Sequence, residues 1–276
     1  MWWQTSRYRI DLSVPRVMGI VNVTPDSFSD GGRFHERATG LAHCEALIRE
    51  GADILDIGGE STRPGAPTLT PQDEWARLEP VLRDAVTLGV PISVDTCKTE
   101  VMQRALDLGV DIINDVKALG APGAEDVVAS HADCGVCLMH MQGEPATMQS
   151  QARYPDVVAS VADFLAGRAQ HLLERGVHAE RIVLDPGIGF AKTPEHNLAL
   201  LRRQAELLAL GYPVLIGWSR KSTLGVITGK PVGERLAASV SAALAGVSLG
   251  AHIVRVHDVA ATVDALKVWR AVFHPA

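Results

Sequence analysis

The segment 92–115, ISVDTCKTEVMQRALDLGVDIIND, contains two short apolar runs that each end in polar residues. Six similar runs occur elsewhere in the chain, at residues 17–21, 54–57, 136–139, 182–184, 214–216 and 253–256. Eight buried strands with polar residues at their C-terminal ends predict an α/β protein with a (β/α)8 TIM barrel and one active-site mouth. A doubly wound open sheet shares the alternation, but it seldom gathers polar residues from all eight strands around one centre.

The segments between these runs favour helices. Leu41, Cys44, Leu47 and Ile48 fall on one helical face. Thr70-Pro71 and Thr193-Pro194 each place a capping hydroxyl before a proline, which predicts the start of a helix. A helix often stops at a left-handed residue, and six glycines stand between an expected helix and the next strand: Gly51, Gly89, Gly109, Gly176, Gly211 and Gly250.

Length and composition limit the class of protein. The chain has 276 residues, which suits one barrel of about 250 residues. We expect a single barrel domain over residues 16–276, with an extension of residues 1–15 that forms a plug or hairpin beneath it. No apolar stretch approaches the ~20 residues of a membrane span, and the first residues do not resemble a signal peptide, so a cytoplasmic protein is expected. A net charge of −6 disfavours nucleic acid as a partner.

The four cysteines are too few for a disulfide scaffold in a chain of this length. Cys134 and Cys137 form a C-x-x-C pair, which could be redox-active or half of a zinc site. However, residues three apart on a strand point to opposite faces, and no second pair completes a metal site. We therefore favour two buried, apolar cysteines.

The polar residues at the strand ends predict the kind of ligand. They include carboxylates (Asp95, Asp185), amides (Asn22, Asn114) and cations (Arg63, Lys221, Arg255), with His257 as a further candidate cation. Carboxylates match paired N–H donors on a heterocycle, whereas Arg and Lys match phosphate or carboxylate groups. Each residue taken singly could cap a helix or form an ordinary salt bridge, so the prediction rests on their convergence.

Two glycine-containing segments follow the first two strands. Residues 24–32, TPDSFSDGG, are polar with one aromatic residue and resemble a mobile lid. Residues 58–65, GGESTRPG, combine glycines that allow close backbone approach with an arginine followed by a stiffening proline, which favours an anion clamp. Both could instead be ordinary connecting loops.

Four segments closely resemble the signatures of the dihydropteroate synthase family: residues 22–32 (NVTPDSFSDGG), 58–65 (GGESTRPG), 185–190 (DPGIGF) and 219–222 (SRKS). Shorter matches follow in the family's order at residues 93–96, 113–115, 138–141 and 255–258. The resemblance covers residues 18–272, and the first two segments are long enough to be highly specific.

The resemblance implies a reaction and its participants. The family condenses 6-hydroxymethyl-7,8-dihydropterin pyrophosphate with p-aminobenzoate, which gives 7,8-dihydropteroate and pyrophosphate in folate biosynthesis. It implies Mg2+ as cofactor, a homodimer, and sulfonamide inhibitors that compete with p-aminobenzoate. The apolar segment 236–249 could supply the dimer surface, although it could equally be a helix buried on the barrel.

The resemblance also assigns roles to residues. The pterin is expected at Asp95, Asn114, Met139, Asp185, Lys221 and Arg255. The p-aminobenzoate is expected at Thr62, Arg63, Pro64, Phe190 and Ser222. The pyrophosphate is expected at Asn22, Thr62, Arg63, Arg255 and His257, with Asn22 also the metal ligand. The residues expected to act in catalysis are Asp26, Phe28, Asp30, Arg63 and Lys221.

The chemistry needs no covalent nucleophile, because an arylamine is largely unprotonated at neutral pH and can attack unaided. We therefore hypothesise an SN1-like displacement, in which Asp26 or Asp30 faces a cationic methylene and Phe28 forms a wall beside the amine. One alternative is a methyltransferase that uses methyltetrahydrofolate, although it has no use for the Arg63 segment. Others are an inactive paralogue acting as a binding module and a sugar-phosphate isomerase, which would not need Asp95, Asn114 and Asp185 together.

Overall fold

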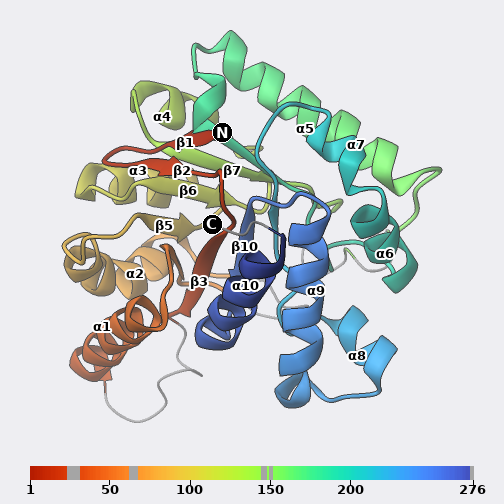
Figure 1. The fold of residues 1–276 in the computed structure, drawn as a ribbon. Helices are drawn as coiled ribbons and strands as arrows, with labels where there is room; N and C mark the ends of the chain where they lie inside the picture. The colour runs from red at the N-terminus through yellow and green to blue at the C-terminus, as the bar shows by residue number, and fades with distance from the viewer. Residues whose placement is uncertain (24–31, 62–67, 144–147, 149–151, 274–276) are drawn as a thin grey trace.

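Eight parallel strands form the predicted barrel in the computed structural model, which describes residues 1–23, 32–61, 68–143, 148 and 152–273 (Figure 1). The strand order is β8-β7-β6-β5-β4-β3-β10-β9, and a bridge between Leu184 and Val214 links the two ends of this sheet. The bounds are β3 (Arg16–Asn22), β4 (Ile54–Gly58), β5 (Ile92–Asp95), β6 (Ile112–Asp115), β7 (Gly135–Met139), β8 (Ile182–Asp185), β9 (Leu215–Ile216) and β10 (Ile253–Val256).

Helices surround the strands (Figure 1). They are α1 (Gly32–Glu50), α2 (Pro71–Ala85), α3 (Thr99–Leu108), α4 (Ala124–Ser130), α5 (Val157–Glu174), α6 (Pro194–Arg202), α7 (Gln204–Leu208), α8 (Ser222–Thr228), α9 (Leu236–Ser248) and α10 (Val259–Phe273). Two short 3-10 helices are η3 (Ala179–Arg181) and η4 (Val232–Glu234).

The predicted helix boundaries are confirmed. The side chain of Thr70 accepts a hydrogen bond from the backbone N–H of Asp73, and that of Thr193 accepts one from His196. All six glycines that were expected to end helices are left-handed, with φ between +79° and +100°. The apolar segment 236–249 forms α9 and its C-terminal capping residue, and Ala242, Ala243 and Val247 of this helix are buried against the barrel.

The N-terminal end of the barrel is filled by apolar side chains. Seven of the eight strands each contribute one inward-pointing side chain to a single cluster: Met18, Ile54, Ile112, Cys137, Val183, Leu215 and Ile253. The hairpin of β1 (Trp2–Gln4) and β2 (Arg9–Asp11) adds Trp3, Ile10 and Leu12 to this cluster. The indole N–H of Trp3 donates to the carbonyl of Arg181 at 2.9 Å, and Arg7 forms an ion pair with Asp111. The C-terminal strand ends therefore form the mouth.

The two cysteines of the C-x-x-C pair are buried and free, as predicted. Cys137 lies in the cluster inside the barrel, whereas Cys134 lies in the core between strands and helices. The strand period therefore places the two thiols on different sides of the sheet.

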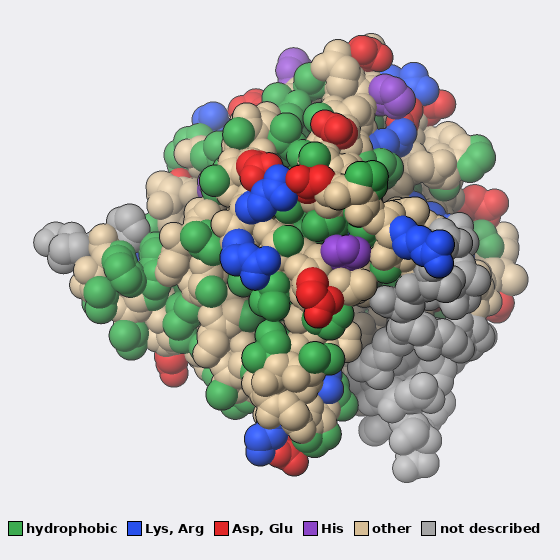
Figure 2. All heavy atoms as spheres, turned by 90° about the vertical axis from the view of Figure 1, so that its right-hand side faces the viewer, with side chains coloured by type: hydrophobic (Ala, Val, Ile, Leu, Met, Phe, Trp, Pro, Cys, Tyr) green, Lys and Arg blue, Asp and Glu red, His purple; other side chains and the backbone are tan. Residues whose placement is uncertain are grey.

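The surface agrees with the composition. The face in Figure 2 mixes Lys, Arg, Asp and Glu side chains among hydrophobic ones, without a single field of basic charge. In the described part of the chain, no helix has the length and apolar character needed to cross a membrane. The cytoplasmic location stays a prediction.

Candidate functional site

A buried charge network lies inside the barrel, above the apolar cluster. Arg255 of β10 donates from Nε to Oδ2 of Asp56 at 2.6 Å and from Nη2 to Oδ2 of Asp95 at 2.7 Å. Asp56 also accepts from Ser93 Oγ at 2.6 Å and from Asn114 Nδ2 at 3.0 Å. Four strands therefore contribute to one hydrogen-bonded group.

The position of Asp56 follows from the strand period. Ile54 belongs to the cluster inside the barrel, and a residue two positions later on a strand faces the same side. The side chain of Asp56 is fully buried. Sequence reasoning missed this residue because it considered the ends of the strands, but a carboxylate two residues after an inward isoleucine was a usable signal. The same period would have found Ser93, which is also fully buried.

One guanidinium faces two carboxylates in this network, so charge is incompletely balanced. Burial raises the pKa of Asp95 to about 7, against the attraction of Arg255, and the charge of Asp56 contributes to the rise. Since Asn114 donates its amide N–H to Asp56, its oxygen remains an acceptor for a ligand.

Asp185 ends β8 beside Met139, the last residue of β7, and these two residues pair in register. Both are nearly buried. Oδ1 of Asp185 accepts from the backbone N–H of Gly187 at 2.7 Å, whereas no hydrogen bond to Oδ2 occurs among the residues that the structure describes. Burial raises the pKa of Asp185, although the Gly187 N–H and the charge of Lys221 oppose the rise. Asp185 and Arg255 therefore share the mouth of the barrel.

Lys221 and Phe190 form a second part of the site. Lys221 Nζ lies 4.2 Å from the centroid of the Phe190 ring, within range of a cation–π interaction. Burial lowers the pKa of Lys221 to about 8, and the nearby charge of Arg255 acts in the same direction. Gly189 has φ +82°, and a Cβ there would lie 3.0 Å from Lys221 Cδ, so a glycine permits this close approach. Ser222 follows Lys221 as the first residue of α8.

His257, which the sequence suggested as a further cation, is uncharged in this site. Burial lowers its pKa to about 4, and the charges of Arg220 and Arg255 contribute, so its ring is neutral near pH 7. The hydroxyl of Ser219 accepts from the backbone N–H of His257 at 3.1 Å and lies 2.9 Å from Nδ1. If the hydroxyl donates its one proton to Nδ1, then Nε2 carries the ring proton and can donate to an anion.

Asn22, the expected metal ligand, is the last residue of β3 and is half-buried beside Gly58 of β4. In the described ranges, no group of three His, Cys, Asp or Glu side chains is arranged to hold a metal ion. Six expected site residues lie outside the described residues: Asp26, Phe28, Asp30, Thr62, Arg63 and Pro64.

A second charge cluster was also missed by sequence reasoning. Lys98 forms ion pairs with both Glu60 and Glu74, and Glu74 is fully buried. Glu60 also accepts from the backbone N–H of Leu69 at 3.1 Å. Glu60 therefore joins the beginning and the end of the segment that contains Thr62, Arg63 and Pro64. No sequence signal identified this cluster, because its members come from three separate segments.

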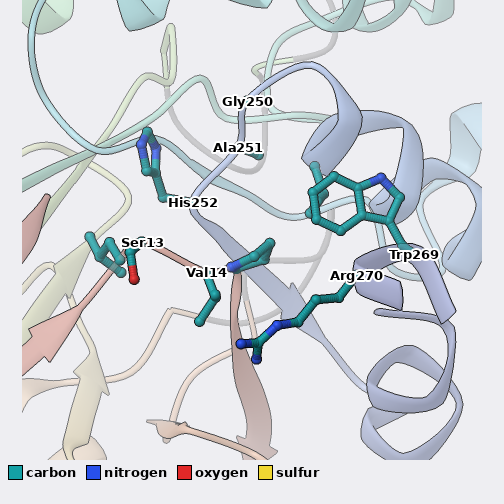
Figure 3. A pocket seen from close by; sticks show the side chains of 10 residues that line it. Ser13, Val14, Gly250, Ala251, His252, Trp269 and Arg270 are labelled. Atoms are coloured by element: carbon teal, nitrogen blue, oxygen red, sulfur yellow. The ribbon is translucent and has the colours of Figure 1, made fainter. Parts of the chain in front are cut away.

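A surface cavity of about 220 Å3 lies elsewhere in the molecule (Figure 3). It is lined by residues that precede β3 or lie between α9 and β10, including Ser13, Val14 and His252, and by Trp269 and Arg270 of α10. It therefore lies toward the N-terminal ends of the strands, away from Asp185 and Arg255, and is not the candidate site.

Known proteins resemble this chain over nearly its whole length. Residues 18–257 match the pterin binding enzyme family. The sequence is 57% identical to dihydropteroate synthase of Neisseria meningitidis serogroup B, over 98% of this chain and 96% of the relative. Among solved structures, dihydropteroate synthase of Xanthomonas albilineans with 4-aminobenzoic acid has a TM-score of 0.93 and 46% identity, and the match covers 99% of both chains.

Two other solved structures carry different ligands. Dihydropteroate synthase of Burkholderia cenocepacia, complexed with 7,8-dihydropteroate, has a TM-score of 0.89 and 49% identity over 98% of this chain and 96% of that one. The enzyme of Yersinia pestis in a sulfonamide drug complex has a TM-score of 0.93 and 40% identity over 99% of both chains.

Proposed function

The chain belongs to the pterin-binding enzymes, and we propose that the charge network at its barrel mouth is the pterin site of a dihydropteroate synthase. The chain is a transferase that condenses 6-hydroxymethyl-7,8-dihydropterin pyrophosphate with p-aminobenzoate. The products are 7,8-dihydropteroate, a precursor of folate, and pyrophosphate. The observation that carries the site assignment is the meeting of Asp95, Asn114 and Asp185 with Lys221 and Arg255 at one end of the barrel.

The pterin half of the site follows from matching donors and acceptors. A pterin edge offers its 2-amino group and N3–H as two parallel donors, and the Asp185 carboxylate can accept both. Lys221 donates to the carbonyl side of the ring. The oxygen of Asn114 and the carboxylate of Asp95 take further ring donors, while Met139 packs on the ring face.

The p-aminobenzoate half lies around Phe190, Lys221 and Ser222. In this proposal, Ser222 and the backbone N–H groups of the first turn of α8 bind the carboxylate. Thr62, Arg63 and Pro64 complete this half. Because a sulfonamide drug binds the Yersinia pestis relative, we expect sulfonamides to compete here with p-aminobenzoate rather than with the pterin.

The pyrophosphate meets Asn22, Arg255 and His257 near the rim of the mouth, together with Thr62 and Arg63. Arg255 uses Nε and Nη2 on Asp56 and Asp95, and among the described residues Nη1 has no hydrogen-bond partner, so it can bind the phosphate. His257 donates from Nε2 as a neutral ring. Mg2+ fits this set because it is usually held by few protein oxygens together with substrate phosphates and water, and Asn22 offers one amide oxygen. When bound, Mg2+ would neutralise charge on the leaving group.

The reaction proceeds by an SN1-like displacement. The bond between the methylene carbon and the pyrophosphate oxygen breaks, and the electron pair leaves with pyrophosphate. Ring nitrogen electrons stabilise the resulting cation until the arylamine nitrogen attacks and then loses a proton. We expect Asp26 or Asp30 to face the cation and Phe28 to shield it from water beside the amine, although all three lie outside the described residues.

A homodimer is the expected assembly. Five large apolar side chains are exposed along α8, η4 and the two ends of α9: Val226, Ile227, Val232, Leu236 and Leu249. Such side chains on adjacent elements favour a protein contact surface. Light scattering at several concentrations would test this, and a monomer at all of them would contradict it.

The decisive test is a coupled assay with dihydropterin pyrophosphate, p-aminobenzoate and Mg2+, followed by detection of dihydropteroate. Formation of dihydropteroate that stops when p-aminobenzoate is omitted supports the proposal. Binding of the pterin without turnover would instead indicate an inactive binding module. Methyl transfer from methyltetrahydrofolate would indicate the methyltransferase alternative. Release of pyrophosphate without the amine would support the dissociative mechanism, whereas strict dependence on the amine would contradict it.

A further inference from the structure

The backbone that carries Phe190 is held at three consecutive residues. The N–H of Gly189 donates to Oδ1 of Asn197 at 2.9 Å, and the carbonyl of Phe190 accepts from Lys192 Nζ at 3.0 Å. The carbonyl of Ala191 accepts from the hydroxyl of Tyr154 at 3.0 Å. Ala191 also has a left-handed φ of +49°, which is unfavourable for a residue with a Cβ. Surrounding contacts therefore determine where this loop lies.

Lys192 connects this loop to another strand end. Besides the carbonyl of Phe190, its Nζ contacts the carbonyl of His140 at 3.2 Å and Nδ1 of His140 at 3.0 Å. His140 directly follows Met139 at the end of β7. The three partners are all acceptors, and they match the three N–H donors of the amine in its protonated form. Burial lowers the pKa of Lys192 to about 7, although the charge of Asp185 opposes this shift. Lys192 is only 3% exposed, so loss of these bonds would not be compensated readily by water.

His140 is suited to accept this hydrogen bond. Burial lowers its pKa to about 3, and the nearby charge of Lys192 contributes, so the ring is neutral. Its ring packs edge-on against Phe164 at 5.0 Å between centroids. Gly187 packs against the backbone of His140, since a Cβ at Gly187 would lie only 2.0 Å from the carbonyl oxygen of His140. The loop after β8 therefore rests directly on the end of β7.

We propose that Lys192 is a positioning residue that holds the ring of Phe190 against Lys221 and thereby shapes the p-aminobenzoate half of the site. This inference rests on the proposed function. Lys192 acts through the backbone of Phe190, since its Nζ is occupied by His140 and by that carbonyl. If the amine is removed, the carbonyl and Nδ1 of the buried His140 and the carbonyl of Phe190 lose a donor, and the Phe190 backbone is free to shift. Asp185 keeps its own bond to the Gly187 N–H, and the charges of Lys221 and Arg255 affect its pKa more than that of Lys192 does, so the pterin half should change less.

The test compares Lys192→Met with Tyr154→Phe. Methionine keeps most of the length of the buried stem but has no donor, whereas Tyr154→Phe removes one hydrogen bond from the next carbonyl in the same loop. We expect Lys192→Met to raise the KM for p-aminobenzoate about tenfold or more when it is measured below pH 7, where Lys192 is protonated, since hydrogen bonds from a charged donor are stronger than neutral ones. The Kd for dihydropterin pyrophosphate should change less than about threefold. Tyr154→Phe should change both constants less than about threefold.

Several outcomes would overturn the inference. One is a KM for p-aminobenzoate that is the same in Lys192→Met and Tyr154→Phe. Another is an equal loss of affinity for pterin and p-aminobenzoate, which a general loss of structure would cause. If Lys192→Met does not fold, Lys192→Gln serves as the second variant. It keeps an N–H donor but not the charge, so the split between the two constants should have the same direction and a smaller size.

The test is separable from the proposed function. An inactive wild-type chain would refute the function, whereas an active wild type with an unchanged Lys192→Met would refute only the role of Lys192. A crystal structure of the variant requires no turnover. It should show the Phe190 ring displaced from Lys221, and an unmoved ring would contradict the proposal.

Discussion

Nε of Arg255 lies 2.6 Å from Oδ2 of Asp56, and this contact joins two residues that are 199 positions apart in the chain. The carboxylate of Asp56 is fully buried and also accepts from Ser93 and Asn114. It therefore binds together side chains from β4, β5, β6 and β10. The ion pair is part of the barrel interior as well as a neighbour of the proposed pterin site.

Replacement of Asp56 should destabilise the protein strongly. In Asp56→Ala, Arg255 loses the fully buried one of its two carboxylate partners, and removal of one member of a buried pair typically costs about 3–5 kcal/mol. The free energy of unfolding, measured by urea denaturation, should fall by roughly this amount. Glu79→Ala is the control, because Glu79 pairs with Arg83 on the exposed surface of α2 and such pairs contribute about 0–1 kcal/mol. Equal losses in the two variants would contradict the structural role of Asp56.

Asp185→Asn should weaken pterin binding. The substitution keeps an oxygen for the Gly187 N–H, but it replaces the other acceptor by a donor that faces the donors of the pterin. We expect the Kd for the pterin substrate, measured by calorimetry, to rise about 10- to 100-fold. Asp111→Asn, at the other end of the barrel, should leave this Kd within about twofold. An unchanged Kd in Asp185→Asn would exclude the assignment.

The activity should decline in alkaline solution because Lys221 loses its proton. Its pKa is lowered to about 8, so the ammonium that donates to the pterin carbonyl is present below this pH and is lost as the pH rises through it. The kcat/KM for dihydropterin pyrophosphate reports groups of the free enzyme and should fall about tenfold per pH unit above that point. Arginine keeps its charge throughout this range, so the decline should be absent in Lys221→Arg. A decline that persists unchanged in that variant must come from another group.

The cap of α6 allows a matched comparison of stability and activity. Thr193→Ala removes the side chain that caps α6 and should lower the free energy of unfolding by about 1 kcal/mol. Gly109→Ala places a side chain on the left-handed residue that ends α3, at φ +100°, and should cost about 1–2 kcal/mol. Only Thr193 directly follows Lys192 and the loop that carries Phe190, whereas Gly109 lies toward the other end of the barrel. We therefore expect Thr193→Ala alone to raise the KM for p-aminobenzoate, and the same KM change in Gly109→Ala would show that lost stability alone is responsible.

The features that the sequence predicted well depend on local chemistry. The strands follow from their apolar runs, and the helix ends follow from left-handed glycines such as Gly51 and Gly250. The helix starts follow from Thr70 and Thr193, whose hydroxyl groups cap within three residues. The position of polar residues at one mouth follows from the direction of parallel strands.

The features that were missed depend on contacts between distant segments. The pairing of Arg255 with Asp56 requires the closed barrel, in which β10 and β4 lie on either side of β3. The neutral ring of His257 results from burial and from neighbouring cations, neither of which is visible in the motif. Lys192 was not singled out because its partner His140 is 52 positions away. Likewise, the segment after Lys221 contains α8 and η4 before α9, a division that the apolar pattern did not indicate.

The hairpin at the start of the chain has a consequence for biosynthesis. The indole of Trp3 bonds to the carbonyl of Arg181, a residue synthesised 178 positions later. A nascent polypeptide therefore cannot bury this tryptophan until Arg181 has been synthesised, so the N-terminal end of the barrel stays open while the strands before Arg181 are made. Deletion of residues 1–12 should leave the C-terminal ends of the strands intact. It should expose the apolar cluster at the N-terminal end of the barrel, which would favour aggregation of newly synthesised molecules.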